Sequence, residues 1–233
     1  MKHYKNGSRT SVKPFPFATL LLILCILLPA CSGSRIVQPL NKSDWQVSAN
    51  FGGPLISNDN KTEITPLSSI TGAYGFRQNI TGFASWQWGS FLYDNYHFDF
   101  GYTHEILQPF SIQPGITYTV QANIIYKEAF SNFKLYPQVD INAYWILPNK
   151  DFIYTGFSNW FELSQTKAHG VNQENFWIPN LHAGYTKFLD KYSAGIEIKY
   201  IAPFETESKN LVEFVNIGDK GAIGVYFSLA RNF

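Results

Sequence analysis

The sequence predicts an all-β fold, an antiparallel up-and-down transmembrane β-barrel of about ten strands, with eight strands as the alternative. Three observations lead to this prediction. From residue 44 onward, apolar and polar side chains alternate with a period of two, which is typical of two-faced strands. The alternating segments are mostly 10–14 residues long, and a tilted membrane-crossing strand needs about 9–11 residues. Charged residues make up only 15% of the 233 residues, and aromatic residues make up 17%.

The chain begins with a segment that is typical of a secretory signal peptide. Four basic residues and no acid precede the unbroken apolar run from Leu20 to Leu28, which small residues follow. We therefore expect residues 1–30 to be removed. No stretch of 18 apolar residues occurs in the sequence, so a conventional membrane-spanning helix is not predicted.

The end of the signal carries a lipoprotein motif. Leu28-Pro29-Ala30-Cys31 resembles the lipobox of bacterial lipoproteins. The resemblance implies that Cys31 becomes the first residue and receives diacylglycerol and then an N-acyl chain such as palmitate, with the lipoprotein-export machinery as a partner. Residues 31–43 would then form a lipidated, polar tether. The alternative is ordinary cleavage after Ser32, with Ala30-Cys31-Ser32 as the small-x-small site. Cys25 leaves with the signal in either case, so the mature chain forms no internal disulfide.

Residues 44–233 are expected to form one barrel domain. In residues 45–51 every odd position is apolar and every even position is polar, and the same alternation recurs along the chain. The expected strands are 44–52, 68–77, 80–92, 95–107, 114–127, 133–148, 151–164, 175–188, 191–203 and 219–232. Pro137 interrupts one of them and predicts a bulge or a break, because proline lacks a backbone donor.

The connections between these strands are of two kinds. Tight turns are expected at residues 77–79, 149–150 and 189–190, and long loops at about 53–67, 165–174 and 204–218. Transmembrane barrels have short turns on one side and longer loops on the other, so both chain ends are expected on the short-turn side. Turn length also predicts register. It places His182 opposite Glu197, Trp145 opposite Tyr154 and Asp140 opposite Asn159.

The last strand carries a family resemblance. Val225, Phe227, Leu229 and the terminal Phe233 share one face, which Arg231 interrupts. An amphipathic last strand that ends in Phe resembles the recognition signal of bacterial outer-membrane β-barrel proteins. The resemblance implies an outer membrane of a Gram-negative bacterium as the location, periplasmic chain ends, and the barrel-assembly machinery and outer-membrane lipid as partners. A monomer is expected.

Alternation alone also permits a soluble lipocalin-like barrel with an apolar interior. The six tryptophans and the other bulky apolar residues would overfill a small lumen, since protein interiors have a fixed capacity. The opposite face is small and polar, so we expect the apolar face to be outside. Aromatic residues near strand ends predict an interfacial girdle, namely Trp86, Trp88, Tyr96, Tyr102, Tyr118, Trp145, Tyr154, Trp160, Trp177, Tyr185, Tyr192 and Tyr200.

The polar face supplies the candidate site residues, a lumen cluster of His97, Asp99, Asp140, His182, Glu197 and Lys199. The simplest interpretation is a set of salt-bridged side chains that fills a narrow interior. The alternative is a hydrolase centred on His182 and Glu197, although no Ser or Cys is expected beside them. The histidines lack metal-ligand spacing, and no cofactor motif occurs.

These observations favour a non-enzymatic barrel with a structural or adhesive role, or a small-solute conduit. The alternatives are the barrel-embedded hydrolase, acting on lipid or peptide, and a soluble lipocalin-like lipoprotein that binds an apolar ligand. Nucleic acid is not an expected partner, because residues 31–233 hold 14 basic and 17 acidic residues.

Overall fold

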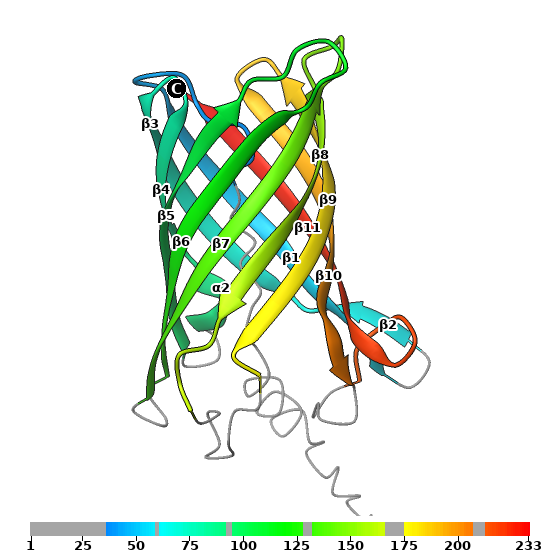
Figure 1. Cartoon of the computed structure of the whole chain (residues 1–233). Helices are drawn as coiled ribbons and strands as arrows, with labels where there is room; N and C mark the ends of the chain where they lie inside the picture. Colours follow the sequence, from blue (N-terminus) through cyan, green and yellow to red (C-terminus); the bar gives the residue numbers. More distant parts are fainter. Residues whose placement is uncertain (1–35, 59–60, 92–94, 128–131, 166–174, 207–212) are drawn as a thin grey trace, which may run out of the picture.

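The computed structural model describes residues 36–58, 61–91, 95–127, 132–165, 175–206 and 213–233. Within these residues the chain forms a closed antiparallel barrel of ten strands, as predicted (Figure 1). The barrel strands are β1 (Trp45–Asn58), β3 (Leu67–Arg77), β4 (Ile80–Trp86), β5 (Asn95–Leu107), β6 (Gly115–Lys127), β7 (Asn132–Ile146), β8 (Phe152–Phe161), β9 (Trp177–Leu189), β10 (Tyr192–Thr206) and β11 (Lys220–Asn232). The short strand β2 (Lys61–Ile64) and the single-turn helix α2 (Trp88–Phe91) belong to connections. The expected signal peptide and Cys31 lie outside the described residues.

Pairing of the first strand with the last closes the barrel. Each barrel strand pairs with the next one along the chain, and β11 pairs with β1 from Gln46↔Asn232 to Pro54↔Gly224. We call this pairing the β1–β11 seam. Closure leaves no edge strand in the wall, so the backbone groups of the barrel strands bond to one another.

The two faces of the wall have opposite chemistry. Large apolar side chains point outward and are solvent-exposed, for example Trp45 at 56% and Leu229 at 56%. Carboxylates point inward, and Asp99 and Asp140 are 0% and 2% exposed. This confirms the predicted orientation, with the apolar face outside. It contradicts the lipocalin-like alternative, which needs an apolar interior and a polar outer wall.

The two ends of the barrel differ in their connections. The short connections after β3, β7 and β9 lie at the end that also holds Phe233, which we call the terminus end (Figure 1). The opposite end, which we call the loop end, carries β2 and α2 (Figure 1). The expected strand 80–92 is therefore shorter than predicted. It ends at Trp86, and the backbone turns where the Ser90 amide donates to the Gln87 carbonyl at 3.0 Å.

The turn between β7 and β8 is longer than the two residues predicted, which reverses the faces of β8. The Leu147 amide donates to the Asp151 carbonyl at 2.7 Å, and Lys150 adopts a positive φ of 71°. Trp145 therefore pairs with Ile153, and Asp140 pairs with Ser158. The predicted pairs Trp145–Tyr154 and Asp140–Asn159 are wrong by one residue. A shift of one residue exchanges the two faces of a strand, so Tyr154 and Trp160 point inward rather than into the aromatic girdle.

The turn between β9 and β10 also differs from the prediction, but without exchanging faces. The turn residues are Asp190 and Lys191, so Leu189 pairs with Tyr192. As a result, His182 pairs with Lys199 rather than with Glu197. Because partner numbers shift by an even amount, every inward residue of these strands remains inward.

The first described residues lie inside the barrel. Ile36, Val37 and Leu40 are buried against inward-facing residues of the wall, and the chain reaches the rim at Lys42, which is exposed. The expected tether 31–43 is thus described from Ile36 onward, and its apolar residues Ile36, Val37 and Leu40 are packed in the bore. Pro137 produces no bulge: β7 continues through it, and the pairing with β8 stops at Gln138, directly beside it.

Candidate functional site in the barrel interior

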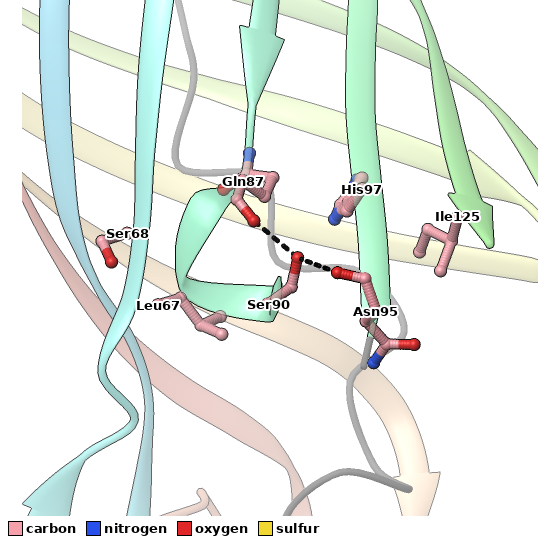
Figure 2. A pocket seen from close by; sticks show the side chains of 7 residues that line it. All are labelled: Leu67, Ser68, Gln87, Ser90, Asn95, His97 and Ile125. Carbon is pink, nitrogen blue, oxygen red and sulfur yellow. Dashed lines mark hydrogen bonds between the residues drawn. The ribbon is translucent and has the colours of Figure 1, made fainter. Parts of the chain in front are cut away.

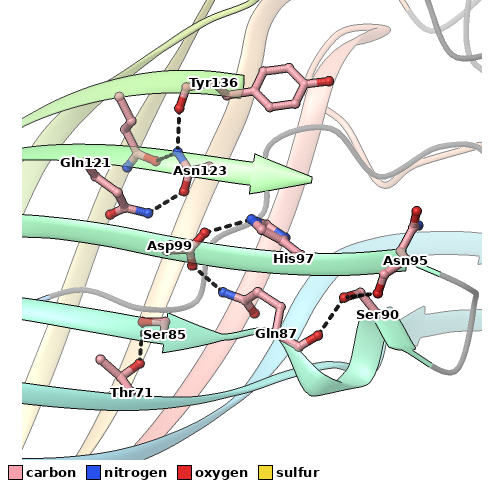
Figure 3. A network of polar contacts seen from close by, with 11 residues as sticks. Thr71, Ser85, Gln87, Ser90, Asn95, His97, Asp99, Gln121, Asn123 and Tyr136 are labelled. Atoms are coloured by element: carbon pink, nitrogen blue, oxygen red, sulfur yellow. Dashed lines mark hydrogen bonds and ion pairs between the residues drawn. The ribbon is translucent and has the colours of Figure 1, made fainter. Parts of the chain in front are cut away.

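A charged cluster occupies the interior near the loop end. His97 and Asp99 lie on the same face of β5, and His97 Nε2 is 2.7 Å from Asp99 Oδ1 (Figure 3). The Gln87 side chain donates to Asp99 Oδ2 at 2.7 Å (Figure 3). Asp99 is fully buried. The sequence predicted that His97 and Asp99 share a face, and the structure shows that they are also in contact.

A second network, made of amide side chains, lies on the neighbouring strands β6 and β7. Asn123 on β6 donates to the Tyr136 carbonyl at 3.0 Å and to Gln138 Oε1 at 3.1 Å, and it accepts a hydrogen bond from Gln121 (Figure 3). The Gln138 amide donates to Asp140 Oδ1 and Oδ2 at 2.8 and 3.0 Å. The Gln138 amide therefore contacts both oxygens of the buried Asp140 carboxylate, and hydrogen bonds of this kind are what a buried carboxylate needs.

His182 lies in a second cluster, on β9. Its Nε2 is 2.7 Å from Asn142 Oδ1, and its Nδ1 is 3.4 Å from Ser158 Oγ. All three side chains are almost fully buried. The expectation that no serine lies beside His182 is therefore wrong. Ser158 was missed because the one-residue shift at the β7–β8 turn placed it on the outer face.

The predicted pair of His182 and Glu197 is not the pair that the described contacts form. Glu197 Oε1 is 3.3 Å from Lys199 Nζ, and Tyr154 donates to Glu197 Oε2 at 2.9 Å. Lys199 also lies over the Tyr226 ring, with Nζ 4.3 Å from the ring centroid. Glu197 and Lys199 therefore neutralise each other inside the barrel, and an aromatic face adds to the stabilisation of the cation.

A third ion pair was not predicted. Lys134 Nζ is 3.1 Å from Glu162 Oε2, and both side chains are buried. Glu162 immediately follows β8, so the same face exchange that hid Ser158 also hid this residue. With the correct turn length, the alternation along β8 would have placed Ser158 and Glu162 inside.

A pocket of about 30 Å³ at the loop end is lined by Leu67, Ser68, Gln87, Ser90, Asn95, His97 and Ile125 (Figure 2). This volume has room for one or two water molecules. Ser90 Oγ donates to the carbonyls of Gln87 and Asn95 at 2.5 and 3.1 Å beside it (Figure 2). Among the described residues, no group of three His, Cys, Asp or Glu side chains is placed to hold a metal ion.

The arrangement therefore serves structure better than chemistry. Each buried charged residue described above contacts an opposite charge or an amide donor, which is the condition for keeping charges in a protein interior.

Within the described part of the chain, no helix is long and apolar enough to span a membrane.

Comparisons with known proteins identify similar architectures only. No family model and no curated protein matches the chain. The solved structures that it is similar to are bacterial outer-membrane β-barrels. The N-terminal β-barrel domain of Pseudomonas aeruginosa OprF is 9% identical, over 83% of this chain and 100% of that chain, with a TM-score of 0.33. The translocator domain of the autotransporter NalP from Neisseria meningitidis is 9% identical, over 83% and 90% of the two chains, with a TM-score of 0.40. The attachment invasion locus protein Ail of Yersinia pestis is 8% identical, over 82% and 99%, with a TM-score of 0.27. At these TM-scores the likeness carries no inference about this chain.

Proposed function

We propose that this chain is an integral β-barrel protein of a Gram-negative outer membrane. The observation that carries the proposal is the reversed distribution of polarity across the wall. Large apolar residues point outward on every side of the barrel, while Asp99, Asp140 and Glu197 are buried inside. In water this arrangement would expose far more contiguous apolar surface than soluble monomers tolerate. A hydrocarbon environment satisfies the outer face, and closure satisfies the backbone.

Aromatic side chains near both ends support a membrane position. At the terminus end, Trp45 and Tyr192 are exposed on the outer face, and at the loop end Trp86 and Trp177 are exposed. Amphipathic rings favour the headgroup depth. Arg231, which interrupts the apolar last strand, lies near the Phe233 and Tyr192 rings, with its guanidinium carbon 4.6 and 5.7 Å from their centroids. An arginine at a strand end can hold its charge at the interface in this way.

The orientation follows from the lengths of the connections. In outer-membrane barrels the short turns face the periplasm, so the terminus end and both ends of the barrel domain are periplasmic in this proposal. The barrel-assembly machinery, which reads an amphipathic last strand ending in Phe, is the assembly partner, and outer-membrane lipid surrounds the wall. The loop end then faces the cell exterior.

The role that the interior supports is structural or adhesive display of the loop end, on a monomeric barrel with a filled lumen. A small-solute conduit is less well supported, because hydrogen-bonded side chains occupy the bore.

A hydrolase is the second candidate, since Ser158 Oγ lies 3.4 Å from His182 Nδ1. Both are almost fully buried, so a substrate would have to displace packed side chains to reach them. Packing therefore explains this cluster better than catalysis.

Membrane fractionation combined with gel mobility tests the membrane proposal. The chain should stay with the outer membrane in high salt and in carbonate. An unheated sample in detergent should migrate differently from a boiled one, because a closed barrel resists unfolding by detergent. Release by high salt, together with identical mobility before and after boiling, would refute the proposal.

We also propose that Cys31 carries lipid, on the basis of its lipobox-like context. Intact-mass spectrometry of the exported protein should show a diacylglyceryl and an acyl group, and a Cys31→Ala variant should lack both. A mature wild-type protein that begins at Gly33, without added mass, would show ordinary cleavage after Ser32 instead.

A further inference from the structure

An extended segment of the chain occupies the bore at the terminus end. We call residues 36–41 the N-terminal segment. Its three branched apolar side chains, Ile36, Val37 and Leu40, are 6%, 5% and 9% exposed. Gln38 and Pro39 between them are half-buried, and Asn41 and Lys42 are exposed at the rim. These side chains are as buried as those of a hydrophobic core, although many of the side chains in the lumen are polar.

The wall around this segment is apolar. Ile36 and Leu40 pack against Ala73 of β3 and Phe83 of β4. Val37 packs against Tyr144 of β7 and Phe152 of β8, with Tyr154 and Phe188 at the margin. We call these six wall residues the collar. Phe83 and Phe152 are phenylalanines on a face where alternation places polar residues, and the N-terminal segment is what covers them.

Backbone hydrogen bonds hold the segment in one register. The Leu40 amide donates to Thr81 Oγ1 at 2.7 Å, and Thr103 Oγ1 donates to the Ile36 carbonyl at 2.9 Å. Thr81 and Thr103 are both fully buried. Near the rim, the Ser43 amide donates to the Gly75 carbonyl at 2.8 Å. The wall thus contacts both the side chains and the backbone of the segment, as a peptide-binding site does.

A glycine in β3 provides the space for the segment to pass. A Cβ atom placed on Gly75 would lie 1.9 Å from the Asn41 carbonyl oxygen and 3.2 Å from that of Leu40. By contrast, a Cβ atom on Gly72, three residues earlier in the same strand, would meet nothing within 4 Å. Any side chain at position 75 must therefore displace the segment, whereas one at position 72 has no such effect.

We propose that the collar is a binding site for an extended peptide with branched apolar side chains, and that residues 36–41 of this chain are its resident ligand, which plugs the terminus end. Without the segment, Phe83 and Phe152 would face water inside the bore, and Thr81 and Thr103 would lose their backbone partners. Apart from these noncovalent contacts, the described chain joins the segment to the wall through residues 42–44, so the segment can leave the collar without unfolding the barrel. This proposal does not depend on where the barrel is located.

Hydrogen exchange measured by mass spectrometry tests the proposal on the full chain folded in detergent. In the wild type, backbone amides of residues 36–41 should exchange at least about 100-fold more slowly than in an unfolded peptide. A Gly75→Ala variant should lose at least about tenfold of that protection, while Gly72→Ala should keep it. Thermolysin, which cleaves before branched apolar residues, should cut at Ile36, Val37 or Leu40 in Gly75→Ala only.

Two controls keep the test decisive. The shift of mobility on boiling shows whether each variant has a folded barrel. If Gly75→Ala does not fold, Leu40→Asp takes its place, with the exposed Lys42→Asp as its matched control. Wild-type segment amides that exchange as fast as an unfolded peptide would overturn the proposal. Full protection in a folded Gly75→Ala or Leu40→Asp variant would overturn it as well.

A free peptide distinguishes a binding site from a tethered strand end. The labelled peptide Ile-Val-Gln-Pro-Leu-Asn should bind a folded variant that lacks residues 36–41, and it should not bind the wild type, whose collar is filled. The same peptide with Asp in place of Leu should not bind. Failure of the unmodified peptide to bind the truncated barrel at millimolar concentration would refute the assignment of the collar as a site.

Discussion

The buried carboxylates show how a single charged residue can be accommodated inside this barrel. Asp99 has no exposed surface, yet one oxygen lies 2.7 Å from His97 Nε2 and the other accepts a hydrogen bond from Gln87. A buried charge without partners would be prohibitively costly, so the surrounding donors are what keep the charge in place. In the polar interior, each buried polar side chain thus supplies the hydrogen-bond or charge partner that its neighbours need.

Replacing Asp99 should destabilise the barrel much more than the same change at its surface. Asp99→Asn keeps the shape but replaces charge-assisted hydrogen bonds with neutral ones and removes the attraction to His97. We expect a loss of about 1–3 kcal/mol in the free energy of unfolding, measured by urea titration in lipid vesicles. Asp190→Asn, in the exposed β9–β10 turn, is the matched control and should change little. Equal effects of the two changes would contradict the role given to Asp99.

Asp151 predicts how stability depends on pH. The hydrogen bond from the Tyr185 hydroxyl is the main cause that lowers the pKa of Asp151, and the Phe188 amide, Asn149 and Lys187 act in the same direction against the opposing effect of burial. A lowered pKa means that the folded state gains stability above the ordinary pKa and loses it as the pH falls through the lowered value.

The Asp151→Asn variant should therefore unfold at a lower temperature than the wild type at neutral pH. The difference should persist down to about pH 4, the ordinary pKa of an aspartate, and shrink only below it. The temperature at which the unheated gel mobility is lost measures this. A difference that already vanishes near about pH 6 would show that Asp151 is not the group responsible.

At the scale of the element, the reversed faces of β8 make a sharp prediction. Phe157 lies midway along β8 and points outward between Ile141 and Leu181, whereas Phe161 is the last residue of the strand. Phe157→Lys should cost about 2–4 kcal/mol of unfolding free energy, and Phe161→Lys about 0–1 kcal/mol, because the cost of a lipid-facing cation depends on depth. Urea titration in vesicles measures both. Similar costs at the two positions would place β8 outside the bilayer.

Strands could be predicted from the sequence because alternation is a local property. The odd positions of residues 45–51 and the outward residues of β6 are apolar in the sequence and outward in the structure. Register could not be predicted equally well, since it depends on turn geometry. A positive φ at Lys150 lengthens one turn, and this single difference placed Trp160, Ser158 and Glu162 on the wrong face.

The N-terminal segment shows a second limit of prediction. Its composition, with Arg35, Gln38 and Lys42 around three apolar residues, is typical of a polar tether. The structure of the wall is needed to see that Ile36, Val37 and Leu40 pack against the collar. Phe83, which alternation places on the same inward face as Ser85, was the available signal, because an apolar residue that points into a polar lumen needs a partner.

At the scale of the whole molecule, side chains from all around the wall and the N-terminal segment occupy the interior of the barrel. The N-terminal segment packs in the bore at the terminus end, and polar clusters extend from beside it toward the loop end. Barrels of about eight strands are just wide enough for side chains to fill, and wide aqueous channels require about 16–18 strands. Ten strands lie close to the filled limit.

The wild-type protein should therefore carry no steady current across a planar lipid bilayer. A porin of about 16 strands, incorporated under the same conditions, provides the positive control, because its lumen is an open aqueous channel. Protection of the inserted protein from protease confirms that it has entered the bilayer. A stable, voltage-independent current from the wild type would contradict the filled interior and favour the conduit role.

The β1–β11 seam has a consequence for biogenesis. It joins residues near position 50 to residues near position 228, so the cylinder cannot close until β11 has been synthesised. Until then the apolar face of each strand is exposed to water, and such intermediates aggregate readily. A nonsense mutation before β11 would therefore leave the cylinder open.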